Sequence, residues 1–323
     1  MADGGAVDIF VYLGGDQEVP DGVTHAIIDP SVNSVRMRAF RDRRQLVSVI
    51  FHDGVENIEI EAFYNCESLR GVKLSGVWGI GERAFCNCIA LSDVEFGDRL
   101  ETIGMQAFSC CSLRSIKMPS VRRVRAGAFC HCSHLMKVEF GSGFKRFGWL
   151  SFYNCPNLQR ITIPLKHNLF ACMNEGQYDH FALCDNLRTV DIVGVERMHK
   201  TISSLLMESW RVEMNDEIDR INRELPSTDS AEKANAIQQW IRSVLDRMEH
   251  YKVEHNRLLK EGMTLLELAV WKTKLDEKDD NSIAEGRAKK AKIDTTIIRN
   301  EQRITSGADI VIRNVVPFLQ LDE

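Results

Sequence analysis

A repeated Ala-Phe pair is the feature that most restricts the fold of this chain. Successive copies, counted from their first residues, are 23, 22, 23, 21, 23 and 29 residues apart. The copies are Ala39-Phe40, Ala62-Phe63, Ala84-Phe85, Ala107-Phe108, Ala128-Phe129, Ser151-Phe152 and His180-Phe181. A near-constant period of this length is typical of a solenoid, in which each coil packs only against its neighbours.

A longer motif, C-x-x-L-x-x-V-x-F, follows each pair. It is clearest in "CESLRGVKL", "CIALSDVEF", "CSHLMKVEF" and "CPNLQRITI". A second, shorter apolar position comes later in each copy, at Ile58, Ile80, Ile103, Val124 and Phe147. Stacked coils place like residues above like residues at about the 4.8 Å strand spacing. We therefore predict one internal ladder of the seven phenylalanines and a second ladder of the leucine and valine of the motif.

This pattern resembles the BspA-like class of leucine-rich repeats, whose motif reads A-F-x-x-C-x-x-L-x-x-V-x-L with an I-G-x-x-A-F return. The whole chain is similar to BspA-like proteins predicted in diatoms. The resemblance covers residues 20–194 and implies a curved solenoid lined by a β-sheet, protein binding and no reaction. Two copies depart from the motif: one residue is lost between Phe108 and Leu113, and "LKHNLFACMNEGQYD" lengthens the step before His180.

The predicted fold class is α+β, with a leucine-rich-repeat solenoid followed by an all-helical region. Residues 1–19 are predicted to cap the open end of the solenoid, residues 20–194 to form the solenoid, and residues 195–323 to be helical. Segment 9–13 is expected to cover two outward isoleucines, Ile27 and Ile50. The alternative is that these isoleucines belong to a contact site.

The helical region is predicted to begin with an antiparallel hairpin. Apolar residues from Met207 to Leu225 recur at helical steps up to Pro226, and a heptad seam then runs from Ile237 to Leu258. A third apolar segment spans 265–275, "DEKDDN" is predicted to be an exposed hinge, and a further helix is predicted for 283–304. Packing of the seam inside the chain is favoured, with oligomerisation through the C-terminal helices as the alternative. "RAKKAK" at 287–292 is similar to a nuclear-import patch, although a solvated helix face is favoured.

The cysteines are interpreted as a structural ladder of thiols. One repeat position is shared by Cys66, Cys88, Cys110 or Cys111, Cys132, Cys155 and Cys184. The alternative is a zinc site that joins Cys86 and Cys88 to Cys110-Cys111 and Cys130-His131-Cys132, with His134 nearby. Residues two apart point to opposite sides of a strand, so one metal ion does not reach both thiols of C-x-C without a special turn. We therefore expect no metal and no cofactor.

The predicted binding face lies on the concave sheet, where the residues that flank the valine of the motif project. Its middle row reads Ile27, Ile50, Lys73, Glu95, Lys117, Glu139, Thr162 and Asp191. Opposite charges in neighbouring coils of this row should pair. The candidate binding residues are Lys73, Glu95, Lys117, Glu139, Asp93, Lys137 and Arg160. A second candidate is a basic patch made by stacking of Arg122, Arg123, Arg125, Lys145 and Arg146. A solvated face is favoured for this patch, with phosphate or acid binding as the alternative.

The sequence restricts the possible functions mainly through the features that it lacks. The formal charge of −5 is spread evenly, with 20 Lys/Arg against 22 Asp/Glu in residues 1–195 and 21 against 24 in the rest, so neither nucleic acid nor a membrane is an expected partner. No phosphate-loop, nucleophile-elbow or zinc-protease motif occurs in the sequence. The sequence predicts a cytoplasmic, non-enzymatic scaffold that binds a protein partner, with the nucleus as an alternative location. The alternative functions are a secreted or surface adhesin and a metal-binding protein.

Overall fold

The computed structural model describes residues 9–170, 179–193 and 208–284. The chain divides into two compact units. The first joins Met1–Val195 to Val212–Leu245, and the second joins Glu196–Arg211 to Asp246–Glu323. Residues 212–245, which were predicted as part of a separate helical region, therefore belong with the repeats.

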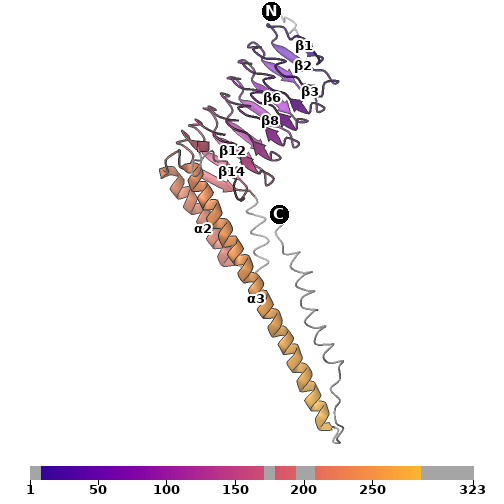
Figure 1. The fold of residues 1–323 in the computed structure, drawn as a ribbon, viewed down its shortest axis with the longest axis vertical. Coiled ribbons are helices and arrows are strands. Elements are labelled where there is room, and N and C mark those ends of the chain that lie inside the picture. Colours follow the sequence, from indigo (N-terminus) through magenta and orange to yellow (C-terminus); the bar gives the residue numbers. More distant parts are fainter. Residues whose placement is uncertain (1–8, 171–178, 194–207, 285–323) are drawn as a thin grey trace, which may run out of the picture. The chain divides into compact units, whose positions relative to one another are not determined.

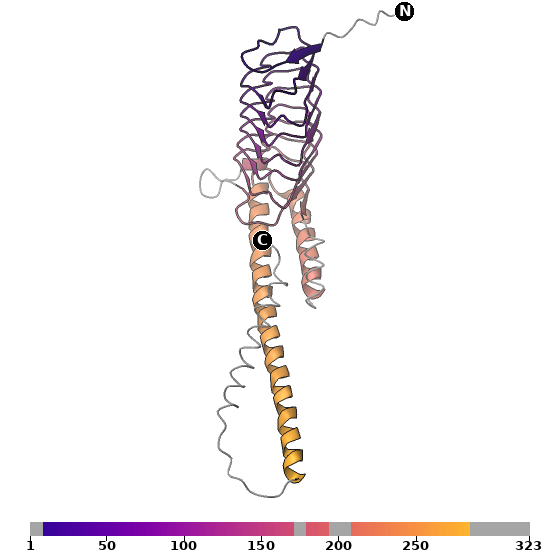
Figure 2. The same cartoon turned by 90° about the vertical axis from the view of Figure 1, so that its right-hand side faces the viewer.

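The first unit is a solenoid whose coils carry one longer and one shorter strand (Figures 1 and 2). The long-strand face consists of β1 (Ile9–Tyr12), β2 (His25–Ile28), β4 (Ser48–Ile50), β6 (Gly71–Leu74), β8 (Asp93–Phe96), β10 (Ser115–Met118), β12 (Lys137–Phe140), β14 (Arg160–Ile163) and β15 (Thr189–Ile192). The short-strand face is one sheet made of β3 (Ser34–Val35), β5 (Asn57–Ile58), β7 (Gly79–Ile80), β9 (Thr102–Ile103), β11 (Arg123–Val124) and β13 (Arg146–Phe147). Strands pair in parallel with equivalent repeat positions opposite each other, as Lys73 is to Glu95.

The predicted phenylalanine ladder is confirmed. Neighbouring rings of the seven residues lie 4.9 to 5.8 Å apart between centroids, and their planes agree to within 16°. All seven rings are fully buried. Tyr12 continues the ladder at its first end, with its ring 5.2 Å from that of Phe40. Each buried ring contributes on the order of 1.5–3 kcal/mol by removal of apolar surface from water.

The cysteine ladder lies beside the phenylalanines. Each buried thiol donates a hydrogen bond, 3.0 to 3.2 Å long, to the backbone carbonyl of a phenylalanine in the preceding coil. The donors are Cys66, Cys88, Cys111, Cys132, Cys155 and Cys184. The structure thus places Cys111, and not Cys110, in the ladder. Burial raises the pKa of the thiols of Cys88 and Cys132 well above the ordinary range, so these side chains act as small buried donors.

The first strand closes one edge of the solenoid with help from a side-chain amide. The backbone N–H of Leu13 donates to Oε1 of Gln17 at 2.6 Å, and Nε2 of Gln17 donates to the carbonyl of Val11 at 3.2 Å. Tyr12 lies between Val11 and Leu13, and its carbonyl accepts a backbone hydrogen bond from the next coil. The Gln17 amide therefore occupies the free side of β1, as a neighbouring peptide group would, and blocks pairing with another strand.

The expectation that segment 9–13 covers Ile27 and Ile50 is wrong. β1 pairs with β2 in register and puts Val11 directly beside Ile27, while Ile27 lies beside Ile50. Ile50 remains 59% exposed. The backbone groups of the segment satisfy their hydrogen bonds by lengthening the sheet, so the segment cannot also lie across its outer surface.

The other end of the solenoid is covered by helices. After the short η1 (Asp179–Phe181) and β15 come α2 (Glu208–Glu224), η2 (Leu225–Ser227) and α3 (Lys233–Ala284). Oδ1 of the Asn222 side-chain amide accepts a hydrogen bond, 2.8 Å long, from the backbone N–H of Val190 on the free side of β15. The apolar residues that these helices bury in the first unit are Met214, Ile221, Leu225, Ile237, Trp240, Ile241 and Val244. The start of the predicted seam is therefore packed inside the chain.

Lys233 attaches the start of α3 to the last coil. Its ammonium donates to the carbonyls of Cys184, Asp185 and Leu187 at 3.2, 2.9 and 2.9 Å. The residue is almost fully buried, and this desolvation lowers the pKa of its amine. Three hydrogen bonds to a charged donor offset the cost of burying the charge.

Replacing Lys233 with alanine is expected to lower the free energy of unfolding by about 1–3 kcal/mol, because two buried carbonyls and one part-buried carbonyl lose their donor. The measurement is urea unfolding followed by circular dichroism. Lys117→Ala is the control, because the Lys117 side chain is 72% exposed and such a change should cost less than about 0.5 kcal/mol. Equal losses in the two variants would contradict the anchoring role.

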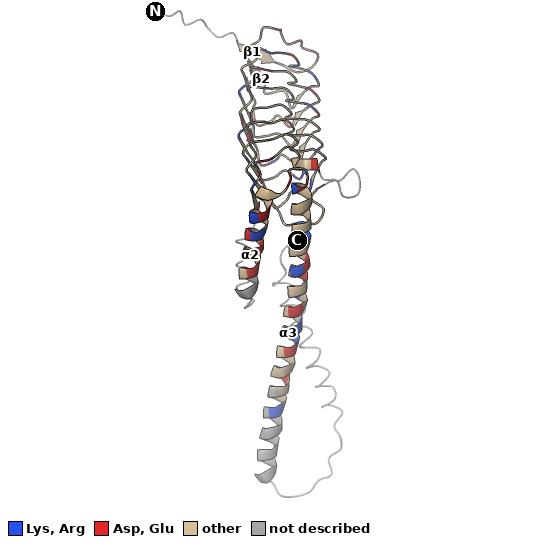
Figure 3. Ribbon diagram, turned by 90° about the vertical axis from the view of Figure 1, so that its left-hand side faces the viewer, with Lys and Arg blue, Asp and Glu red and all other residues tan. Residues whose placement is uncertain are grey.

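The second unit contains the remainder of α3, whose charged residues of both signs are interspersed along the helix (Figure 3). The predicted hinge at 276–281 is wrong, since α3 continues through it to Ala284. That stretch has charged residues but neither glycine nor proline, so nothing in it interrupts a helix. The third apolar segment is part of the same helix, where Leu265 and Leu266 are exposed. The rest of the helix predicted for 283–304, and "RAKKAK", lie outside the described residues from 285 on.

None of the helices in the described ranges is long and apolar enough to cross a bilayer.

Candidate functional site

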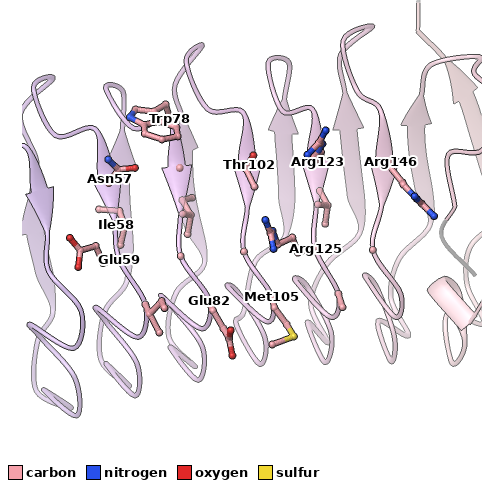
Figure 4. A pocket seen from close by; sticks show the side chains of 18 of the residues that line it. Asn57, Ile58, Glu59, Trp78, Glu82, Thr102, Met105, Arg123, Arg125 and Arg146 are labelled. Atoms are coloured by element: carbon pink, nitrogen blue, oxygen red, sulfur yellow. The ribbon is translucent and has the colours of Figure 1, made fainter. Parts of the chain in front are cut away.

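A groove with a volume of about 1530 Å³ runs along the short-strand face (Figure 4). All six strands of that sheet contribute to its lining. The outward residues of the strands form one row across the coils, which reads Ser34, Asn57, Gly79, Thr102, Arg123 and Arg146. The alternate residues, such as Ile58 and Ile103, are buried in the core. The groove is therefore the outer surface of the sheet, carried by the second apolar position of each repeat.

Glycines make the floor of the groove. A Cβ atom on Gly81 would lie 2.6 Å from the backbone carbonyl carbon of Glu59, and one on Gly104 would lie 2.5 Å from that of Gly81. Real Cβ atoms do not come so close to backbone, so adjacent coils approach here only because the side chains are absent. The middle of the floor consequently consists of backbone, with larger side chains around it.

Apolar side chains that are open to solvent lie around this floor. Trp78 is 48% exposed, and Met105 is 37% exposed. Met37 and Ile60 add two more exposed apolar groups toward the first coils. Exposed aromatic and methionine side chains gathered beside a hollow are typical of interaction surfaces. Sequence reasoning did not single out these residues, because each is isolated in the sequence and only stacking brings them together.

The basic patch predicted from the sequence lies at one end of the groove. Arg123, Arg125, Lys145 and Arg146 are exposed and line it, and Arg123 lies directly opposite Arg146 in the neighbouring strand. Within the described residues none of these four has a carboxylate within ion-pair distance. Arg122, the fifth residue of the prediction, does not line the groove and pairs instead with Glu101 at 3.6 Å.

The opposite end of the groove carries carboxylates. Glu59 accepts hydrogen bonds from the hydroxyl of Ser34 and the backbone N–H of Met37, both at 2.9 Å. Glu82 lines the groove in the next coil. The groove is thus acidic toward the first coils, apolar in its middle and basic toward β13.

The long-strand face differs, because its charges neutralise each other. Lys73 pairs with Glu95 at 3.1 Å, and Arg160 pairs with Asp191 at 3.3 Å. Glu139 is contacted by Lys137 and, at 3.5 Å, by Lys117. The predicted pairing across coils is confirmed. The hydrogen bond from Lys137, followed by the charges of both lysines, lowers the pKa of Glu139. Asp93 is the remaining candidate residue of this face, and it is exposed on β8.

Three further cysteines, Cys86, Cys110 and Cys130, lie outside the thiol ladder. Cys88 points into the core, whereas Cys86 lies half-buried on the other side with Cys110 and Cys130 near Ser109. Desolvation raises the pKa of Cys86 to about 11. Nδ1 of His131 is hydrogen-bonded to the Asn154 amide at 2.9 Å. Among the residues with described placement, no group of three or more His, Cys, Asp or Glu side chains could hold a metal ion.

Comparison with known proteins agrees with the repeat. The family described as "BspA type Leucine rich repeat region (6 copies)" matches residues 21–120, 75–187 and 120–214, which together exceed half of the chain. A comparison with curated proteins found no match.

Two solved structures are similar to this chain over part of their length. A leucine-rich repeat protein of T. pallidum is 30% identical, with 42% of this chain and 63% of that protein covered and a TM-score of 0.39. A leucine-rich repeat protein of Bacteroides ovatus is 24% identical, with 54% and 50% covered and a TM-score of 0.40. This chain therefore spans less than two thirds of either protein. With its repeats matched from residue 21 to residue 214, the chain belongs to the BspA-type leucine-rich repeat family.

Proposed function

We propose that this chain is a non-enzymatic protein-binding scaffold, and that it holds a segment of its partner in the groove on the short-strand face. The family suggests protein–protein interaction or surface binding in general. The observation that carries the choice of surface is the groove itself. It combines exposed apolar side chains with four cations that have no counter-charge among the described residues.

The dimensions of the groove suit a peptide segment. Six strands at a spacing of about 4.8 Å span roughly 24 Å, which is the length of about seven residues of extended chain. The groove is open to solvent, whereas a small-molecule site encloses most of its ligand. Trp78 and Met105, near the middle, would contact apolar side chains of the segment.

The long-strand face is a second candidate surface. Its charged residues Lys73, Glu95, Lys117 and Glu139 already pair with each other, so a partner that binds through them must first compete with these pairs. One observation favours this face nonetheless: exposed Val11, half-buried Ile27 and exposed Ile50 form an apolar row at its first end.

The test is selection of peptides from a random dodecapeptide phage library on the immobilised full chain. We expect the enriched peptides to bind at least about tenfold more weakly to Trp78→Ala combined with Met105→Ala, since aromatic anchors in interfaces commonly contribute 2 kcal/mol or more. Ile89→Ala is the matched control, because Ile89 is also exposed but lies outside the groove.

Two results would contradict the groove as the binding site. Enrichment no greater than on a blank surface would remove the evidence for peptide binding. In the other result, the peptides bind the variant with Trp78→Ala and Met105→Ala as tightly as the wild-type chain, and lose affinity for Lys73→Glu combined with Lys117→Glu. That result would place the site on the long-strand face.

A further inference from the structure

The two ends of the groove carry opposite charge, and the basic end lacks an internal counter-charge. From this we infer that the groove selects a partner segment with acidic side chains clustered at one end, which dock on Arg123, Arg125, Lys145 and Arg146. Apolar residues at the other end of the segment contact Trp78 and Met105. The inference rests on the proposed function and adds the chemistry and the orientation of the partner.

Stacking of like charges is the first observation behind this inference. Arg123 and Arg146 occupy directly opposed positions of neighbouring strands, where like charges repel and destabilise a sheet. On the long-strand face, by contrast, the directly opposed Lys73 and Glu95 form an ion pair. The repeat can therefore place a carboxylate opposite a cation, and at β11 and β13 it does not. An acidic ligand would supply the missing charge.

The acidic-to-basic change along the groove is also present in the sequence of the surrounding coils. Residues 51–100 contain four Lys/Arg and nine Asp/Glu, and residues 101–150 contain eight and two, so the formal charges of the two stretches are −5 and +6. Each stretch forms successive coils of the solenoid. Complementary potentials of this kind orient a charged partner and speed its association.

The acidic end restricts the class of ligand. A uniform polyanion such as a nucleic acid strand that filled the groove would pass over Glu59 and Glu82. A peptide with acidic residues at one end alone avoids that repulsion. Arginine also suits carboxylates geometrically, since its planar guanidinium can donate two parallel hydrogen bonds to one carboxylate.

Three synthetic dodecapeptides with a common apolar half test the inference against the full chain. The other half carries four glutamates, four glutamines or four lysines. We expect the glutamate peptide to bind at least about tenfold more tightly than the glutamine peptide in 0.1 M salt. The lysine peptide should bind most weakly. The preference for glutamate should shrink in 1 M salt, because the screening length falls from about 10 Å to about 3 Å.

Arg146→Glu gives a readout that a purely structural role for the arginine cluster would not produce. The new carboxylate lies opposite Arg123, so thermal unfolding of the free protein should occur at the same or a higher temperature. Affinity for the glutamate peptide should nevertheless fall at least about tenfold. Arg114→Glu is the matched control, because Arg114 is exposed in a nearby coil but does not line the groove.

The outcomes separate this inference from the proposed function. Equal affinity for the glutamate and glutamine peptides, with both weakened by Trp78→Ala, would overturn the acidic selectivity and leave peptide binding in the groove intact. Displacement of the glutamate peptide by 10 mM inorganic phosphate from the wild-type chain, but not from Arg146→Glu, would place the peptide carboxylates on the arginine cluster and support the inference. Loss of all peptide binding in the wild-type chain would overturn both.

Discussion

Phe108→Ala is expected to lower the free energy of unfolding of the solenoid by about 3–5 kcal/mol, the usual cost of removing a buried phenylalanine ring. The ring is fully buried and stacks between Phe85 at 5.2 Å and Phe129 at 5.6 Å. Its removal leaves a cavity in the middle of the ladder, where neighbouring coils cannot collapse without losing strand register. Urea unfolding at 25 °C, followed by circular dichroism, gives the free-energy difference.

Trp78→Ala is the control for that experiment. It removes a larger aromatic group from the same solenoid, but this side chain is about half exposed on the short-strand face. The expected loss of stability is smaller than for Phe108→Ala, because about half of the removed surface already faces solvent. If Phe108→Ala cost no more than Trp78→Ala, the ladder would not be the core of the solenoid.

The inward-facing residues of the solenoid were predictable from the sequence. Every coil must bury the same positions against its neighbours, so phenylalanine and cysteine return at a fixed phase, and Phe63 and Cys66 find their partners one coil away. Pairing of Lys73 with Glu95 followed from the same phase. The solenoid needs no information beyond the repeat to specify these contacts.

The groove was only partly predictable. The basic patch was found because Arg123 and Arg146 share one repeat position. The position of Met105 is also apolar in the coils of Met37 and Ile60 but not in that of Glu82, and the position of Trp78 is charged in its neighbours, Glu56 and Glu101. No stacking requirement acts on outward side chains, so the repeat does not fix their type. The floor of the groove depends on the close approach of backbone at Gly81 and Gly104, which the repeat pattern does not predict.

The ends of the solenoid were predicted least well, because they do not repeat. Gln17 and Asn222 close the two outer strands with single side-chain amides, and no motif marks either residue. The segment that forms β1 was expected to cover the long-strand face, since its apolar character fits a cover and an edge strand equally well. In the helical region, the charged run at 276–281 fits an exposed helix as well as a hinge.

Acidification is expected to destabilise the solenoid through His180. This residue replaces the alanine of the repeated pair, is fully buried, and has its ring 5.2 Å from that of Phe170 and 6.4 Å from that of Phe147. Neither ring nitrogen has a hydrogen-bond partner among the described residues. Desolvation lowers the pKa of His180 from 6.5 to about 3. The folded state therefore keeps the ring neutral over a range in which the unfolded chain takes up a proton.

The sign and size of the effect follow from proton linkage. Between pH 6.5 and pH 3 the unfolded state binds more protons than the folded state at this site, so stability falls as the pH falls. Two pH units below 6.5, the loss should be about 2–3 kcal/mol at 1.36 kcal/mol per unit. Urea unfolding at pH 7.5 and pH 4.5 measures it. His180→Leu has no titrating ring, and the variant should lose less stability than the wild-type chain over the same range by that amount. Equal pH dependence in the two proteins would show that the ring is protonated, or hydrated, in the folded state.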